Sequence, residues 1–152
     1  MQSNLYYAGS DWIHGFRGFD TRNNIKYINS PGESRKIVYH AASMGVVLDP
    51  TACKQQFFKG HKDDIMAIAV HYSSDPSVGV VVASGQQAIG NIYVWQGTTQ
   101  KLLSSIASGQ KSVQMLEFSS DGRLLVSIAE DKSVAVSDWK SQVAVASYMY
   151  NV

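Results

Sequence analysis

The stretch that decides the fold is Gly60 to Gln96, which reads GHKDDIMAIAVHYSSDPSVGVVVASGQQAIGNIYVWQ. Residues 64–71 interleave two apolar series, which indicates a strand buried on both faces. A valine-rich run at 78–84 and an aromatic run at 91–95 have compositions typical of strands. Turn-forming residues such as Ser, Asp, Pro, Gly and Asn separate these runs. The stretch therefore predicts short strands joined by turns.

The same arrangement continues downstream. A further strand is expected at 101–106, and four more at 113–119, 124–129, 133–137 and 143–148. Trp95 and Ser137 occupy corresponding places about 42 residues apart, a spacing typical of WD repeats. Four short strands make one blade of a β-propeller. Because no segment shows a helical apolar stripe, an all-β fold is predicted.

Residues 60–96 resemble a WD repeat. Gly60-His61 matches the pair that opens a repeat, Ser84 matches the hydroxyl position on its second strand, and Trp95 matches the tryptophan that closes it. The resemblance implies that the His, Ser and Trp side chains form a hydrogen-bonded chain with a neutral, internal imidazole. Buried polar groups of this kind must all be satisfied. Gln96 departs from the pattern, since an Asp is usual there.

The second repeat is more degenerate. Gly109-Gln110 replaces the opening Gly-His pair, and the closing tryptophan is replaced by serine, although Asp138 is retained. Ser127 and Asp131 still fit the hydroxyl and turn-acid positions. We expect this blade to form with an incomplete polar network.

Upstream, residues 12–24 (WIHGFRGFDTRNN) join two aromatic–glycine turns to a polar run, just ahead of β-rich sequence. This stretch closely resembles the HELP motif of the echinoderm microtubule-associated protein-like (EMAP-like) family, in which the motif precedes WD repeats. Strands are expected at 25–28, 36–40, 45–48 and 55–58, so the region can supply a third, irregular blade. The motif residues are Trp12, Gly15, Phe16, Arg17, Gly18, Asp20, Arg22, Asn23 and Asn24.

The aromatic side chains of this region favour a structural role. Aromatics beside glycines in a β protein are usually core, so Trp12, Phe16 and Phe19 are expected to be core rather than a platform for nucleic-acid bases. Tyr27 is likewise expected to be buried. The polar residues Arg22, Asn23 and Asn24 are expected to hydrogen-bond backbone near their turn.

Composition narrows the class of protein. The 152 residues are 45% hydrophobic and only 16% charged, with a net charge of +1. This suits a β-rich globular protein and provides no strong field for nucleic acid or a membrane surface. The single cysteine, Cys53, permits no internal disulfide and suggests a reduced, intracellular thiol. No apolar run approaches the roughly 20 residues of a membrane span.

Catalytic and metal-binding patterns are missing from the sequence. No nucleophile elbow, phosphate-binding loop or His-Glu-x-x-His occurs, and the four histidines are dispersed. Asp63-Asp64 is expected to be a solvated turn, because adjacent strand residues point to opposite faces and cannot act as an acid–base couple. No catalytic residue, cofactor or metal ligand is therefore expected, and an enzyme is the least favoured class.

These observations predict an all-β WD-repeat β-propeller fragment, with a HELP unit, two four-stranded blades and a ring that is not closed. The expected regions are 1–55 for the HELP region, 56–107 for the first repeat and 108–152 for the degenerate second repeat. A closed propeller needs about four to eight blades, so the chain is expected to be part of a larger propeller. Its open blade faces predict self-association.

The resemblance implies a non-catalytic interaction module that associates with tubulin or microtubules, in the cytoplasm and cytoskeleton or in a cilium or flagellum. A local excess of basic residues would suit the acidic surface of tubulin. The alternative is a general WD-repeat scaffold that binds other proteins without touching tubulin. The basic residues in question are Arg17, Arg22, Lys26, Arg35 and Lys36.

Overall fold

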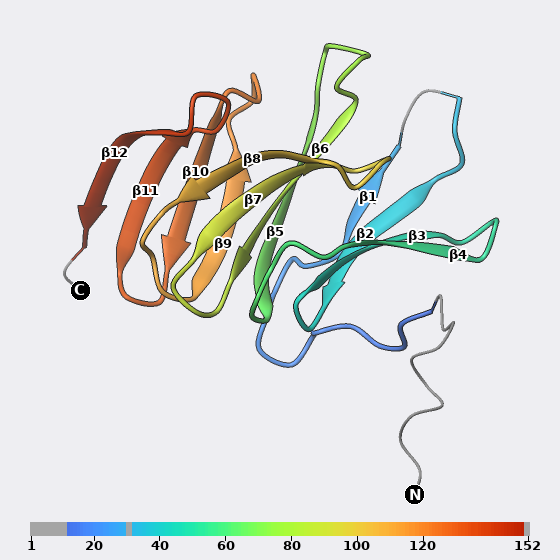
Figure 1. The fold of residues 1–152 in the computed structure, drawn as a ribbon, viewed down its shortest axis with the longest axis horizontal. Helices are drawn as coiled ribbons and strands as arrows, with labels where there is room; N and C mark the ends of the chain where they lie inside the picture. The colour runs from blue at the N-terminus through green and yellow to red at the C-terminus, as the bar shows by residue number, and fades with distance from the viewer. Residues whose placement is uncertain (1–11, 30–31, 151–152) are drawn as a thin grey trace, which may run out of the picture.

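The computed structural model describes residues 12–29 and 32–150, which form three four-stranded antiparallel sheets (Figure 1). We number them sheet 1 (β1–β4), sheet 2 (β5–β8) and sheet 3 (β9–β12). Each is a meander in which strands consecutive in the chain are paired. From the N-terminus the strands are β1 (Lys26–Ile28), β2 (Lys36–Ala41), β3 (Met44–Asp49), β4 (Lys54–Phe58), β5 (Ile65–Tyr72), β6 (Val80–Gln86), β7 (Asn91–Gln96), β8 (Leu102–Ala107), β9 (Val113–Phe118), β10 (Leu124–Ala129), β11 (Ser133–Asp138) and β12 (Val143–Met149).

The all-β prediction is confirmed, with one correction to the number of blades. Sheet 1 is a regular four-stranded meander rather than an irregular unit, so the described residues hold three four-stranded sheets, not two. The physical reason is that β2, β3 and β4 pair over most of their lengths, as in Val38↔Val47 and Val47↔Gln56. The expected regions 1–55 and 108–152 extend into residues 1–11, 30–31 and 151–152, which lie outside the described residues.

Sheet 2 lies between the other two sheets and contributes to two separate cores (Figure 1). In β6, Val80 and Val82 pack with sheet 1. Val81 and Ala83, which alternate with them, pack with sheet 3. This follows from the alternation of side chains across a strand, and it explains why β6 is apolar on both faces.

The core between sheets 1 and 2 is centred on two stacked aromatic rings. Phe58 and Trp95 lie 4.9 Å apart between ring centroids, with 5° between their planes. Gly45 permits this packing, because a Cβ atom built there would lie 2.8 Å from the Trp95 ring. Branched aliphatic residues fill the rest: Ile28, Val38, Val47, Ile65, Ile68, Val80 and Val82.

The core between sheets 2 and 3 depends on a close approach of β5 to β9. Ala67 and Ala69 supply the small side chains on β5, opposite Leu116 and Phe118 of β9. At the edge of this core, Gly122 has φ +71°, and a Cβ atom there would lie 2.0 Å from Nε2 of His71. Only glycine therefore fits this turn.

Sheet 3 ends in β12, whose residues are all exposed. Its large apolar side chains include Val143, Val145, Tyr148 and Met149. Among the described residues, no helix is long and apolar enough to span a membrane.

Candidate interaction surface

Residues 12–25, which we call the strap, cross sheet 1 before the chain enters β1. The side chain of Gln55 holds the start of the strap: its Oε1 accepts from the Ile13 amide at 2.6 Å and its Nε2 donates to the Ile13 carbonyl at 3.0 Å. Gln55 Nε2 also donates to Tyr39 Oη at 2.8 Å. By strand alternation, Gln55 and Tyr39 lie on the face of sheet 1 that points away from sheet 2. The strap therefore covers that face.

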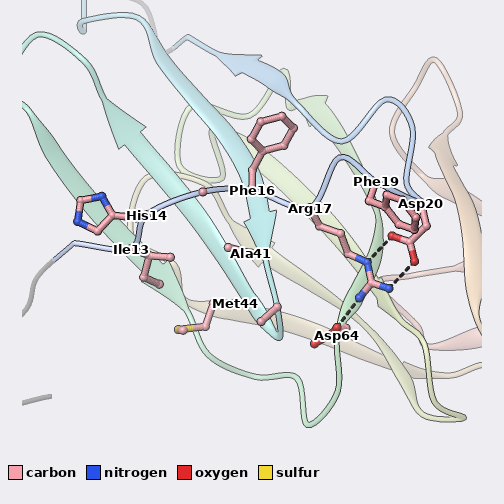
Figure 2. A pocket seen from close by; sticks show the side chains of 11 residues that line it. Ile13, His14, Phe16, Arg17, Phe19, Asp20, Ala41, Met44 and Asp64 are labelled. Carbon is pink, nitrogen blue, oxygen red and sulfur yellow. Dashed lines mark hydrogen bonds and ion pairs between the residues drawn. The ribbon is translucent and has the colours of Figure 1, made fainter. Parts of the chain in front are cut away.

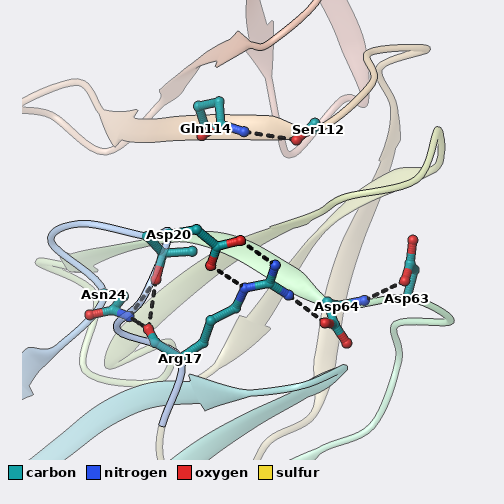
Figure 3. A network of polar contacts seen from close by, with 8 residues as sticks. Arg17, Asp20, Asn24, Asp63, Asp64, Ser112 and Gln114 are labelled. Carbon is teal, nitrogen blue, oxygen red and sulfur yellow. Dashed lines mark hydrogen bonds and ion pairs between the residues drawn. The ribbon is translucent and has the colours of Figure 1, made fainter.

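The middle of the strap is tied to sheet 2 by Arg17 (Figure 3). Its Nε and Nη2 donate to the two carboxylate oxygens of Asp20 at 2.7 and 2.6 Å, and its Nη1 donates to Asp64 Oδ2. Hydrogen bonding to Asp20 raises the pKa of Arg17, and the same bonds lower the pKa of Asp20. Bidentate arginine–carboxylate pairs are geometrically specific. Asp64 directly precedes β5, and its side chain anchors the strap although it is 43% exposed.

We call the contacts of Arg17 with Asp20 and Asp64 the clamp. A short polar loop follows it in the chain. Thr21 Oγ1 donates to the Arg17 carbonyl at 2.6 Å, and Asn24 Nδ2 donates to the same carbonyl and to Thr21 Oγ1 at 2.7 Å. Thr21 and Asn24 are both buried. Asn23 adopts a left-handed conformation with φ 54°, which asparagine tolerates better than most residues. Of the three polar residues expected to bond backbone, Asn24 is brought into this loop, while Arg22 and Asn23 are exposed.

The expected burial of the HELP aromatics is wrong. Trp12, Phe16 and Tyr27 are 37%, 55% and 68% exposed, and Phe19 is fully exposed. The reason is that the strap runs over the outer face of sheet 1, whereas the core built on the Phe58–Trp95 stack lies on the opposite face, between sheets 1 and 2. The motif instead buries polar Thr21 and Asn24.

A cavity of about 560 Å³ lies between the strap, the β2–β3 turn and the start of β5 (Figure 2). We call it the strap pocket. Apolar and aromatic side chains surround it, and the Arg17–Asp20–Asp64 cluster forms one wall. Its lining residues are Ile13, His14, Gly15, Phe16, Arg17, Phe19, Asp20, Ala41, Ala42, Met44 and Asp64.

In sheet 2 the structure joins the three residues of the first repeat. His61 Nε2 lies 2.8 Å from Ser84 Oγ, which accepts from Trp95 Nε1 at 3.0 Å. Burial lowers the pKa of His61, so its ring is neutral at physiological pH. Gln86, which sequence reasoning missed, places Oε1 3.0 Å from His61 Nδ1. Its place at the end of a fully buried strand is the signal that could have identified it.

In sheet 3 the polar network has different members from those of sheet 2. Gln110 takes the place of histidine: its Oε1 accepts from Ser127 Oγ, and its Nε2 donates to Ser133 Oγ at 3.0 Å. Asp131 Oδ1 accepts from the Ser133 amide at 3.1 Å. Asp138 lies apart from this group and pairs with Arg123 at 3.1 Å.

Trp139 and Ser137 show how sheet 3 accommodates the missing tryptophan. Ser137, at the usual tryptophan position, is buried. Trp139 is also buried, and its Nε1 donates to the Gly122 carbonyl at 2.7 Å. The indole therefore packs at the edge of the core between sheets 2 and 3 instead of joining the polar network.

His40 on β2 is fully buried, and neither ring nitrogen has a hydrogen-bond partner among the described residues. Burial, together with the smaller effect of the nearby Arg17 charge, lowers the pKa of His40 to about 4. The Arg17 amide donates to the His40 carbonyl at 3.2 Å, so the strap runs beside β2 at this residue. The sequence indicated only that His40 is a strand residue.

The five basic residues predicted to meet a partner are not equally available. Arg17 is held by two aspartates, and Lys36 Nζ lies 3.7 Å from Glu33. Arg22 and Lys26 line a second cavity of about 390 Å³ beside Asp20 and Glu117 of β9, and Arg35 is exposed. Within the part of the chain that the structure describes, no cluster of three or more His, Cys, Asp and Glu side chains could hold a metal ion.

Comparison with known proteins identifies the motif and the relatives. A family model described as "HELP motif" matches residues 9–46. The 77 kDa echinoderm microtubule-associated protein of Strongylocentrotus purpuratus is 31% identical over 145 residues, covering 87% of this chain and 20% of that protein. Echinoderm microtubule-associated protein-like 1 of Homo sapiens is 29% identical over 146 residues, covering 90% of this chain and 17% of that protein. The chain thus spans about a fifth of the length of the curated relatives it matches.

Among solved structures, one titled "Structure of Dos1 propeller" superposes with a TM-score of 0.65 at 18% sequence identity. The match covers 84% of this chain and 35% of the other chain. At this identity the likeness concerns the fold alone. The three sheets are therefore blades of the β-propeller type, and the chain carries a HELP motif and has EMAP-like homologues.

Proposed function

Starting from the HELP motif and the EMAP-like homologues, we propose that this chain is a non-catalytic interaction module that associates with microtubules or tubulin in the cytoskeleton. The observation that carries the proposal is the similarity to microtubule-associated proteins, which extends over 87% of the chain rather than the HELP segment alone. The clamped strap and the His61–Ser84–Trp95 chain support it, because they hold the surface in one geometry, as a binding module requires.

We also propose that the chain contributes three blades to a larger propeller. Each blade packs on the next through an apolar face, and β12 has such side chains exposed. Contact with further blades would cover the exposed face of sheet 3.

The experiment is pelleting of the longest available form of the protein with polymerised microtubules. We expect it to pellet at low salt and to be released as salt rises, since exposed charges are screened over about 8 Å at physiological ionic strength. The double substitution Arg22→Glu/Arg35→Glu should weaken pelleting. Lys101→Glu/Lys140→Glu is the matched control, because it reverses the same charge at exposed positions of sheets 2 and 3.

Absence of pelleting at low salt would exclude microtubule binding and leave the second candidate, a general WD-repeat scaffold. The observation that favours this alternative is that Arg17 and Lys36 are already paired with acidic residues, which reduces the basic surface of the strap. Pelleting that is insensitive to both double substitutions would keep the function but place the binding surface elsewhere.

A further inference from the structure

Two aromatic side chains that line the strap pocket are exposed. Phe19 is fully exposed and Phe16 is 55% exposed, although both line the pocket. Single exposed apolar residues are common, but aromatic side chains gathered at the rim of a cavity are typical of anchor sites for partner residues.

The charge of the pocket selects the kind of partner. Three charged side chains line it in the described part of the chain: Arg17, Asp20 and Asp64. Two carboxylates against one guanidinium leave a net charge of −1. The guanidinium is directed at the carboxylates, which use its Nε, Nη1 and Nη2. The pocket is therefore complementary to a cation rather than to an anion.

Asp64 is the carboxylate that can accept a further hydrogen bond. Both oxygens of Asp20 accept from Arg17, whereas Arg17 bonds only Oδ2 of Asp64 (Figure 2). Among the described residues, Oδ1 of Asp64 has no hydrogen bond, and the side chain is 43% exposed. A carboxylate has about four lone-pair sites, so this oxygen can accept from an incoming donor.

The pocket is also preorganised. Gln55 pins the strap on one side, and Arg17 and the Thr21–Asn24 loop pin it on the other. Binding therefore requires little ordering of the backbone, which lowers the entropic cost of association.

We propose that the strap pocket binds a segment of a partner protein in which a lysine or arginine adjoins an aromatic or aliphatic residue. The cationic group would donate to Asp64 Oδ1, and the exposed Phe16 and Phe19 rings would contact other side chains of the segment. The apolar neighbour would enter the pocket beside Met44. This inference rests on the geometry and charge of the pocket, and it concerns a partner of opposite charge to the acidic surface of tubulin.

The test uses the full 152-residue chain and an array of fluorescent peptides. Each peptide carries one Arg or Lys flanked by Leu, Phe, Tyr or Trp, and each has a matched peptide with Glu in place of the basic residue. We expect some basic peptides to bind, with their Glu counterparts at least about tenfold weaker, and binding should fall as salt rises.

Two substitutions test whether the peptides bind at the strap pocket. Phe19→Ser should weaken binding severalfold, and because this ring is fully exposed the fold should be unaffected. Asp64→Asn should weaken basic peptides and reduce the preference over Glu peptides. The matched controls are Ile89→Ser, an exposed apolar residue of the β6–β7 turn, and Asp75→Asn, an exposed carboxylate of the β5–β6 loop.

Failure of the whole array to bind would overturn the proposal, as would equal binding of basic and acidic peptides. Unchanged binding in Phe19→Ser would overturn it as well. Circular dichroism of Asp64→Asn checks that the chain stays folded, and Phe19→Ser tests the site independently of the clamp. Microtubule pelleting is measured separately, so either proposal can fail without the other.

Discussion

His40 makes the stability of this protein depend on pH in a direction that the structure determines. Its ring is fully buried and its nitrogens lack partners among the described residues, so burial lowers its pKa from 6.5 to about 4. Below pH 6.5 the unfolded chain binds a proton at this residue that the folded chain does not bind. The free energy of unfolding should therefore be constant above about pH 6.5 and fall as the pH drops toward 4.

The magnitude follows from the difference in pKa. A pKa lower by about 2.5 corresponds to about 3 to 4 kcal/mol, at about 1.4 kcal/mol per unit. The groups around His40 are Arg17 and Asp20 on the strap and His61 in sheet 2. The pKa of His61 is also lowered by burial, so its contribution has the same sign.

The assay is urea unfolding followed by tryptophan fluorescence between pH 7.5 and 4.5, on the wild type and on His40→Leu. Leucine keeps the backbone bond from the Arg17 amide to the residue 40 carbonyl and removes both unpaired nitrogens. At pH 7.5 the variant should be at least as stable as the wild type, because replacing an unsatisfied polar group by an apolar one is neutral or stabilising.

As the pH falls to 4.5, His40→Leu should gain about 2 to 3 kcal/mol relative to the wild type. The comparison cancels His61 and the carboxylates, which titrate in both proteins. A difference between the two proteins that does not change with pH would refute the reasoning. So would a strong loss of stability in the variant at pH 7.5, since it would mean that the imidazole makes a favourable bond.

Three further outcomes test the blades and their packing. Ser84→Ala leaves His61 Nε2 and Trp95 Nε1 without their shared partner, so it should lower the free energy of unfolding in urea by about 2 to 4 kcal/mol. The control Ser105→Ala, at a half-buried position of β8, should lower it by less. Gly122→Ala should lower the melting temperature clearly more than Gly109→Ala. Both glycines have positive φ, but of the two only Gly122 would place a Cβ atom against another side chain, that of His71. Equal losses of melting temperature would refute the packing argument. The isolated chain should self-associate through exposed apolar faces such as that of β12, so that its mass by light scattering rises with concentration, and a constant monomer mass at high concentration would contradict this.

The sequence allowed most strands to be predicted, because strand signals are local. Apolar and alternating runs, bounded by Gly, Asn, Asp and Ser, indicated each strand from β1 to β12 near its observed place. The resemblance of Gly60-His61, Ser84 and Trp95 to a WD repeat also implied a hydrogen-bonded chain, and the structure has it. The first four strands were expected to form an irregular blade, but they form a regular one. The short length of β1 and the HELP segment ahead of it made the strand pattern harder to recognise in the sequence.

The candidate site was less accessible to sequence reasoning, because it depends on contacts between distant residues. Arg17 and Asp64 are 47 positions apart, and no local pattern pairs them. From the sequence, Arg17 was predicted to bind a partner because it lies in a basic run. In the folded chain its guanidinium is instead paired with Asp20 and Asp64.

By itself, the sequence determined the all-β class, the order of the strands and the HELP resemblance, because periodicity, turn chemistry and motifs are written in neighbouring residues. Only the tertiary structure decided which aromatic rings are buried: Trp95 and Phe58 lie between two sheets, whereas Phe16 and Phe19 lie on a segment that runs over the outer face of sheet 1. It also decided that His40 faces inward without a partner. Burial depends on what the rest of the chain places over a residue, and a sequence pattern shows a side chain's face without showing what covers it.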